Sequence, residues 1–210
     1  MNKSAASLLA LALTSTLAFA AKDADLKPVL ATPGKSLLDA HFRSDKLETP
    51  WTVAKGDWVV QDGAVVGKEK ESDHHNAVLF LKLPARDSII RFSYKLDGIN
   101  KFELSYNDAK GHLFRVMVEA TSLVITKDRD KKDATSTRET LAKTSANLPA
   151  GEWHTMLVEV KGEQVNVQTD DGSKVELKDP LIAEDKTGFR FVLKGASLLL
   201  DDVRVWEAAP

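Results

Sequence analysis

The sequence predicts an all-β protein that folds as a two-sheet antiparallel β-sandwich. Short runs of β-branched and aromatic residues recur along the chain with turn residues between them. No window of helical length carries apolar residues at three- and four-residue spacing. About a dozen short strands in one domain are typical of a jelly roll, in which two antiparallel sheets pack face to face.

The first 21 residues have the pattern of a signal peptide. Lys3 gives a short basic start, residues 5–17 are apolar but too few to span a bilayer, and residues 18–20 (Ala-Phe-Ala) fit a cleavage site. A buried N-terminal helix has a similar composition, but Lys22 ends the apolar run abruptly. We therefore expect cleavage after Ala20, a secreted or periplasmic location, and no membrane span in the mature chain.

Residues 22–36 are predicted to be a lead-in segment, and residues 37–210 a single domain. The lead-in contains Pro28 and Pro33 and has no periodicity, whereas the remaining chain is long enough for one sizeable core.

The chain has no cysteine, which excludes disulfides and thiol chemistry. Its 29 Lys and Arg and 31 Asp and Glu are interleaved, a balance that favours a neutral ligand over nucleic acid or an anionic membrane.

The first strands are short. Residues 51–53 and 58–60 are two of them, and residues 61–63 (Gln-Asp-Gly) turn the second back into residues 64–67 as a hairpin. The next strand covers residues 76–83 and ends at a proline.

Three successive strands, residues 88–96, 102–106 and 112–119, share one alternating design, with apolar side chains on one face and polar side chains on the other. If neighbouring strands are in register, their polar side chains form one continuous sheet face. This predicted polar face consists of Arg91, Ser93, Lys95, Glu103, Ser105, Arg115 and Glu119.

The remaining strands follow in the same way. Residues 122–127 form one, and residues 128–147 are a polar stretch that we expect to be a long exposed connection. The last strands are residues 153–160, 164–169, 174–177, 187–194 and 197–206. Among the four tryptophans, Trp58 and Trp206 are the predicted core members.

Three segments match a known family. The first is W-T-V at residues 51–53 followed by G-D-W-V-V-Q-D-G-A-V-V-G at 56–67. The second is G-E-W-H at 151–154 with its hairpin up to residue 167, and the third is L-D-D-V-R-V at 200–205. Together they resemble the concanavalin A-like lectin/glucanase superfamily, in particular its secreted bacterial domains called 3-keto-disaccharide hydrolase. Such motifs specify a fold better than an activity.

The resemblance implies a jelly roll that binds or processes carbohydrate. Its enzymatic form is hydrolysis of a glycosidic bond in a 3-keto-disaccharide or related glycoside. Because a keto group acidifies the neighbouring carbon, such cleavage can proceed by proton abstraction and elimination, with a histidine or glutamate as the base. On this interpretation His75 and Glu103 are the catalytic residues. The alternatives are a non-catalytic glycan-binding or adhesion module of the laminin G-like type, and a structural envelope protein.

Residues 71–76 (E-S-D-H-H-N) are the sharpest local cluster. They echo the E-x-D-x-x-E signature of retaining glucanases, but Asn76 stands at the position of the acid, and an amide cannot protonate a leaving oxygen. Histidine and carboxylate ligands suit zinc, although neighbours on an extended chain point to opposite sides, so a solvated loop is the alternative. We expect Asp73, His74 and His75 at the rim of a ligand site.

The predicted polar face is the second candidate site. Arginine and carboxylate side chains hydrogen-bond sugar hydroxyls, and exposed aromatic rings stack on sugars. A solvated face of alternating charges, which repels edge pairing, is the alternative. The residues predicted to bind ligand on this face are Arg91, Lys95, Arg115 and Glu119.

No cofactor is expected, except that a structural calcium ion could be held by Asp201 and Asp202. A polar pair at a strand end is the alternative for these two residues. The aspartates at 128, 130 and 133 resemble a calcium loop only in number, because the glycine and the distal glutamate of an EF-hand are missing.

Overall fold

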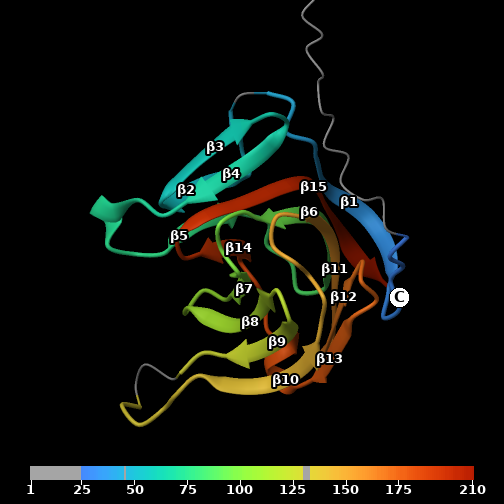
Figure 1. The fold of residues 1–210 in the computed structure, drawn as a ribbon. Coiled ribbons are helices and arrows are strands. Elements are labelled where there is room, and N and C mark those ends of the chain that lie inside the picture. Colours follow the sequence, from blue (N-terminus) through green and yellow to red (C-terminus); the bar gives the residue numbers. More distant parts are fainter. Residues whose placement is uncertain (1–24, 45, 130–132) are drawn as a thin grey trace, which may run out of the picture.

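The computed structural model describes residues 25–44, 46–129 and 133–210 (Figure 1). The predicted signal peptide lies outside the described residues. The described chain forms two antiparallel sheets packed face to face, which confirms the predicted β-sandwich. Neither of its two helices, both short 3-10 turns, has the length and apolar character of a membrane span.

One sheet has eight strands among the described residues. Seven of them follow the order β13-β12-β11-β6-β15-β4-β3, and β1 pairs with the C-terminal half of β15 (Figure 1). Their bounds are β1 Thr32–Ala40, β3 Asp57–Gln61, β4 Ala64–Lys68, β6 Ser88–Leu96, β11 Trp153–Lys161, β12 Gln164–Thr169, β13 Lys174–Lys178 and β15 Ala196–Ala209.

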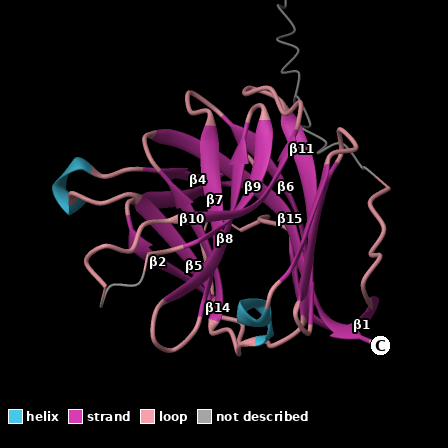
Figure 2. Ribbon diagram, turned by 90° about the horizontal axis from the view of Figure 1, so that it is seen from below, coloured by secondary structure: helices cyan, strands magenta, loops and turns pink. Residues whose placement is uncertain are grey.

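The other sheet has seven described strands in the order β10-β9-β8-β7-β14-β5-β2. Their bounds are β2 Trp51–Lys55, β5 Ala77–Leu81, β7 Lys101–Asn107, β8 His112–Glu119, β9 Ser122–Lys127, β10 Glu139–Ser145 and β14 Gly188–Leu193. The 3-10 turn η1 (Glu71–Asp73) projects from the β2–β5 side of this sheet (Figure 2), whereas η2 (Pro180–Ala183) lies against β8 of this sheet and β11 and β12 of the other.

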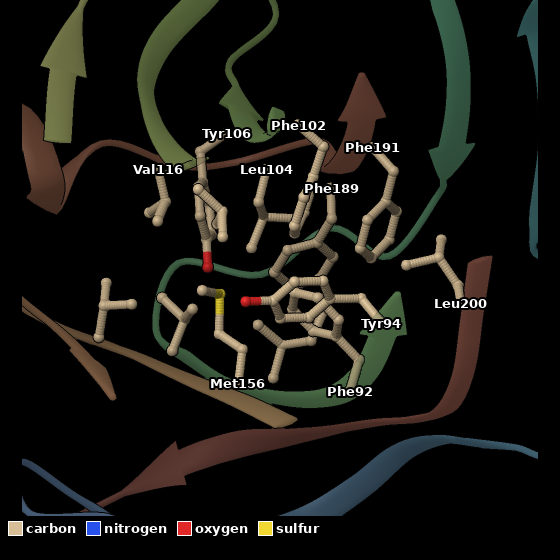
Figure 3. Close-up of a cluster of buried hydrophobic side chains, with 14 of the residues drawn as sticks. Phe92, Tyr94, Phe102, Leu104, Tyr106, Val116, Met156, Phe189, Phe191 and Leu200 are labelled. Atoms are coloured by element: carbon tan, nitrogen blue, oxygen red, sulfur yellow. The ribbon is translucent and has the colours of Figure 1, made fainter. Parts of the chain in front are cut away.

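The core lies between the sheets and explains the alternation of the strands. Phe92 and Tyr94 of β6 pack against Phe102 of β7 and Phe191 of β14, with ring centroids 4.9–6.2 Å apart (Figure 3). These four side chains are at most 1% exposed. In each strand every second side chain points into the core, so the alternate side chains point to the outer face of that sheet.

The expectation of one continuous polar face is wrong. The strand β6 belongs to the eight-stranded sheet, whereas β7 and β8 belong to the seven-stranded sheet. Because the inner faces of the two sheets meet in the core, Arg91 and Lys95 lie on the opposite outer face from Glu103 and Arg115. The predicted face is therefore two separate faces.

Three smaller expectations also differ from the structure. The strand β1 begins at Thr32, inside the expected lead-in. It pairs with β15 on one side only, and such an edge strand tolerates a proline, here Pro33. The expected connection 128–147 contains the edge strand β10. Trp58 is 7% exposed in the main core, as predicted, but Trp206 lies outside it, against a small second cluster.

The residues before β1 dock on the outer face of the eight-stranded sheet. The fully buried carboxylate of Glu159 accepts hydrogen bonds from the backbone N–H groups of Val29 and Leu30, both at 2.8 Å, and from that of Ala31 at 3.4 Å. The side chain of Asn166 donates to the same carboxylate at 2.7 Å. A buried carboxylate of this kind is stabilised by its donors, so these hydrogen bonds anchor the N-terminal segment on the sheet.

Candidate functional site

The outer face of the seven-stranded sheet carries a row of side chains that crosses five strands and is polar at every position except Phe80. The strand register places Phe80 beside Arg190, Arg190 beside Ser105, and Ser105 beside Arg115, which is followed by Thr126. The inward neighbours of these residues form the core, so the row itself faces outward. We call this row, with the side chains that contact it, the central face.

Arg115 is the centre of an ion-pair network on the central face. Its guanidinium binds Asp128 through Nε, 3.0 Å from Oδ2, and through Nη2, 2.6 Å from the same oxygen, and it also donates to Glu103. Arg138, from the β9–β10 connection, donates to Glu103 Oε1 at 3.0 Å and lies 3.1 Å from Asp128 Oδ1. Two cations and two carboxylates thus alternate in one network.

The network shifts the pKa of two of its members, Asp128 and Arg115. Burial raises the pKa of the Asp128 carboxyl, but the hydrogen bonds and charge of Arg115 outweigh it, so the pKa lies below its ordinary value. Burial lowers the pKa of Arg115, and its two carboxylate partners reverse the direction. Both oxygens of Glu103 are bound by arginines. The predicted catalytic Glu103 therefore lies in ion pairs with both Arg115 and Arg138.

His112 joins the central face through a β-bulge. Tyr106 pairs with Phe114, but the next residue, Asn107, pairs with His112 instead of Leu113. The bulge lets Leu113 enter the core and turns the imidazole outward beside Asn107. Strict alternation would have grouped His112 with the inward Phe114, which is why sequence reasoning missed it.

Polar partners orient the imidazole of His112. Its Nδ1 lies 2.8 Å from Nδ2 of Asn107 and 3.4 Å from Oγ of Ser105, and Ser105 donates to Oδ1 of Asn107 at 3.1 Å. Asp128 Oδ2 is 4.0 Å from the same nitrogen. The Asn107 amide has a donor in its NH₂ group and an acceptor in its oxygen, so either orientation of the amide satisfies one tautomer of the His112 ring. The negative charge of Asp128 favours the protonated form of the ring.

Arg190 lies over an aromatic ring, whereas Arg115 is ion-paired with carboxylates. Its guanidinium carbon lies 4.9 Å from the centroid of the Phe80 ring, and Lys82 Nζ lies 6.0 Å from the same ring. Among the residues that the structure describes, Arg190 makes no ion pair, and its buried Nε–H has no hydrogen-bond acceptor. The central face therefore offers one guanidinium whose side chain is not neutralised by a carboxylate.

The histidine loop lies at the edge of the same sheet. Residues 71–76 lead into β5, and the η1 turn projects beyond the β2–β5 end of the sheet in Figure 1. Asp73 accepts a hydrogen bond from the backbone N–H of Gly56 at 2.7 Å, and this bond lowers the pKa of its carboxyl. His74 and His75 are exposed. No hydrogen bond within the described part of the chain joins either histidine to Glu103.

The other predicted ligand-binding residues lie elsewhere. Arg91 binds Asp202 at 2.6 Å on the outer face of the eight-stranded sheet. Glu119 accepts a hydrogen bond from Ser122 at 2.9 Å where β8 turns into β9. Lys95 lies 6.0 Å from the ring of Trp153. None of these three contacts the central face, because two are on the opposite sheet and one is at a strand end.

Asp202 is already bound by cations. Besides Arg91, Arg204 reaches its Oδ1 at 2.8 Å, and His41 lies between Asp202 and Asp39 at 3.4 and 3.2 Å. The ligand atoms of Asp39, His41 and Asp202 lie within 4.8 Å of one another. Two guanidinium groups so close oppose a further cation, since like charges repel. The structural calcium ion remains a prediction.

The two packed antiparallel sheets define a jelly-roll domain of the kind found in carbohydrate-binding modules and glucanases. The chain belongs to the family of 3-keto-alpha-glucoside-1,2-lyase-like domains, whose sequence model matches residues 34–196. This match confirms the resemblance seen in the sequence. No curated protein matches the chain significantly.

Three solved structures illustrate the shared fold. Carbohydrate binding module CBM66 from Bacillus subtilis has a TM-score of 0.61 at 14% identity, covering 76% of this chain and 96% of the other. A galectin-like protein of unknown function from Bacillus subtilis has a TM-score of 0.59 at 11% identity, covering 86% and 99%. LamA from Z. galactanivorans, in complex with laminaritriose and laminaritetraose, has a TM-score of 0.57 at 13% identity, covering 84% and 100%. At these identities the likeness establishes the fold alone.

Proposed function

We propose that the central face binds a glycoside carrying a 3-keto group and cleaves its glycosidic bond by elimination. One observation carries this proposal: an oriented imidazole, His112, lies on the same outer face as Arg190, which has no carboxylate partner among the described residues. Ser105 is the neighbour of both, by register with Arg190 and by its 3.4 Å contact with His112. The family description, a 3-keto-alpha-glucoside-1,2-lyase-like domain, supports this reaction class.

The reaction needs a base and a donor to the ketone oxygen. His112 removes the proton from C2, next to the ketone, and the electron pair moves into the enolate, whose oxygen is stabilised by Arg190. The enolate then re-forms the ketone as its electrons make a C1–C2 double bond, and the C1–O bond breaks. The leaving oxygen departs with the bonding electrons and takes up a proton. Water added across this double bond completes a net hydrolysis, with no oxidant or reductant consumed.

His112 suits the role of base better than Glu103. Both Glu103 oxygens are bound by arginines, whereas an imidazole titrates near neutral pH. The neighbouring Asp128 stabilises the imidazolium that proton uptake creates. Glu103 then acts by holding Arg115 and Arg138 in position. The catalytic role predicted for His75 stays a prediction; because its side chain is exposed on the loop at the edge of the sheet, we assign it to the rim of the site.

Turnover of a 3-keto-disaccharide by the mature protein, compared with its unoxidised parent, tests the proposal. We expect cleavage of the keto compound alone and exchange of its C2 hydrogen with solvent. His112→Gln should reduce the rate at least a hundredfold, on the scale of a lost general base, and His75→Gln is the matched control that should retain it. Equal cleavage of the parent sugar, or full activity of His112→Gln, would overturn the mechanism.

A non-catalytic glycan-binding module is the second candidate. This candidate is favoured by the ion pairing of both Glu103 oxygens, because no free carboxylate is left there to act in catalysis. The paired arginines and carboxylates still offer hydrogen-bond donors and acceptors to sugar hydroxyls. In that case glycans bind saturably, and neither product nor C2 exchange forms. The same samples therefore separate the two functions.

We also propose that the chain is exported and that its signal peptide is cleaved after Ala20. The support is the sequence pattern of residues 1–21, which lie outside the described residues. The mass and N-terminal sequence of protein recovered from a secreting host test this, and a product that retains Met1 to Ala20 would refute it.

A further inference from the structure

A cavity lies on the side of the sandwich opposite the central face. Its volume is about 340 Å³, and it opens on the outer face of the eight-stranded sheet. The strand register places Trp153 beside Lys95, Lys95 beside Leu199, and Leu199 beside Val66, so the cavity crosses four adjacent strands, β11, β6, β15 and β4. None of these residues belongs to the central face.

The floor of the cavity is apolar and aromatic. Leu199 and Val66 lie beside the half-buried Trp153, and Lys95 Nζ is 6.0 Å from the indole ring. Val59, beside Val66 on β3, is 53% exposed and extends the apolar strip. The indole Nε1–H of Trp153 is buried and has no acceptor among the described residues. A buried N–H group without an acceptor lowers the stability of the fold, and a ligand oxygen that accepts its hydrogen bond would remove this penalty.

The walls of the cavity are acidic. Asp62 lies in the β3–β4 turn, Asp97 follows the end of β6, and Asp201 precedes the positive-φ residue Asp202 on β15. Asp201 is partly buried, and this burial raises the pKa of its carboxyl. With Lys95 as the lining cation, the cavity is negatively charged and disfavours anionic ligands.

We propose that this cavity is a second carbohydrate-binding site, for a pyranose unit without an anionic group. The apolar face of such a ring packs on Trp153, Leu199 and Val66, while its hydroxyls donate to the aspartates and accept from the ammonium of Lys95. The volume is at the lower end of the range of about 300–1,000 Å³ typical of small-molecule sites, which suits one or two sugar units. The site is independent of the function proposed for the central face.

The indole N–H signals of the mature protein provide a direct test. The chain has four tryptophans, and Trp153→Phe assigns the Trp153 signal in a ¹⁵N-¹H correlation spectrum. Titration with neutral hexose oligosaccharides should shift this signal saturably, and a uronic acid oligosaccharide should not. A Trp153 signal that stays unchanged with every neutral sugar at millimolar concentration would overturn the proposal, as would binding of the uronate alone.

Variants separate the two sites. Asp62→Ala, in an exposed turn, and Lys95→Gln should each weaken neutral-sugar binding at the Trp153 signal at least threefold without loss of the folded spectrum. His112→Gln should leave this titration unchanged, and Lys95→Gln should leave turnover at the central face unchanged. If both wall variants bind as the wild type does, the cavity is not the site. Failure of the elimination mechanism would not affect this result.

Discussion

Gly67→Ala should destabilise the protein by driving Trp58 out of its place in the core. A Cβ atom at Gly67 would lie 2.3 Å from Cζ3, 2.4 Å from Cε3 and 2.6 Å from Cη2 of the indole. Carbon atoms pack best at about 3.5–4.0 Å, so the ring has to move by more than an ångström. Trp58 is 7% exposed and donates from Nε1 to the carbonyl of Lys55 at 3.0 Å, so movement also strains this hydrogen bond.

The expected loss of stability is the sum of the cost of the steric clash and the cost of the strained hydrogen bond. Overpacking of a core costs about 1–3 kcal/mol, and a typical intramolecular hydrogen bond contributes about 1 kcal/mol. We therefore expect Gly67→Ala to lower the free energy of unfolding by about 2–4 kcal/mol, which corresponds to about 5–15 °C in Tm for a domain of this size. Urea and thermal unfolding, followed by circular dichroism, measure both quantities.

A double-mutant cycle with Trp58→Leu is the control. The three crowded atoms belong to the six-membered ring of the indole, which leucine lacks. Gly67→Ala should therefore cost much less in the Trp58→Leu background, with a coupling of at least about 1 kcal/mol between the sites. An unchanged Tm for the single variant, or equal costs in both backgrounds, would refute the steric argument.

Three further predictions concern buried polar groups. Glu159→Leu should release the N-terminal segment, and hydrogen exchange of the amides of residues 29–31 should become fast; protection at the wild-type level would contradict this docking. Tyr106→Phe should leave the unfolding free energy unchanged or raise it by up to about 1 kcal/mol, because the buried hydroxyl has no partner among the described residues; a large loss in urea unfolding would contradict this. Burial lowers the pKa of His154, but hydrogen bonds to Asp170 and the Pro149 carbonyl raise it overall; its stabilisation is therefore complete below about pH 6.5 and lost as the pH rises through the folded pKa. The stability difference between wild type and His154→Gln should be larger near pH 5 than near pH 8, and a difference independent of pH would refute this assignment.

The sandwich could be predicted because alternation is a local property of each strand. Phe92 and Tyr94 alternate with Arg91 and Ser93 because one side of β6 faces the core, and this is visible in the sequence without knowledge of the partner strand. The same alternation does not reveal which sheet a strand joins. The chain leaves the eight-stranded sheet at Leu96 and enters the other sheet at Lys101, so one predicted polar face became two.

The candidate site was only partly predictable. Arg115 and Glu103 were recognised because they alternate with core residues, but their ion pairing to Asp128 and Arg138 depends on the connection between β9 and β10, which follows both of their strands in the sequence. The expected long connection hid β10, whose largely polar sequence, E-T-L-A-K-T-S, is that of an edge strand. Nothing in the sequence around Arg190 indicated that it lacks a carboxylate partner in the described fold.

The bulge at His112 makes the central face sensitive to the length of the chain as well as to its side chains. Outward orientation of the imidazole depends on one extra residue in β8 relative to β7, between the pairs Tyr106–Phe114 and Asn107–His112. Deleting a single residue from the turn 108–111 would shift this count, and regular pairing would bring Leu113 opposite Asn107. Every residue of the site could then be conserved while the site itself is lost, so loop length is part of its chemical specification.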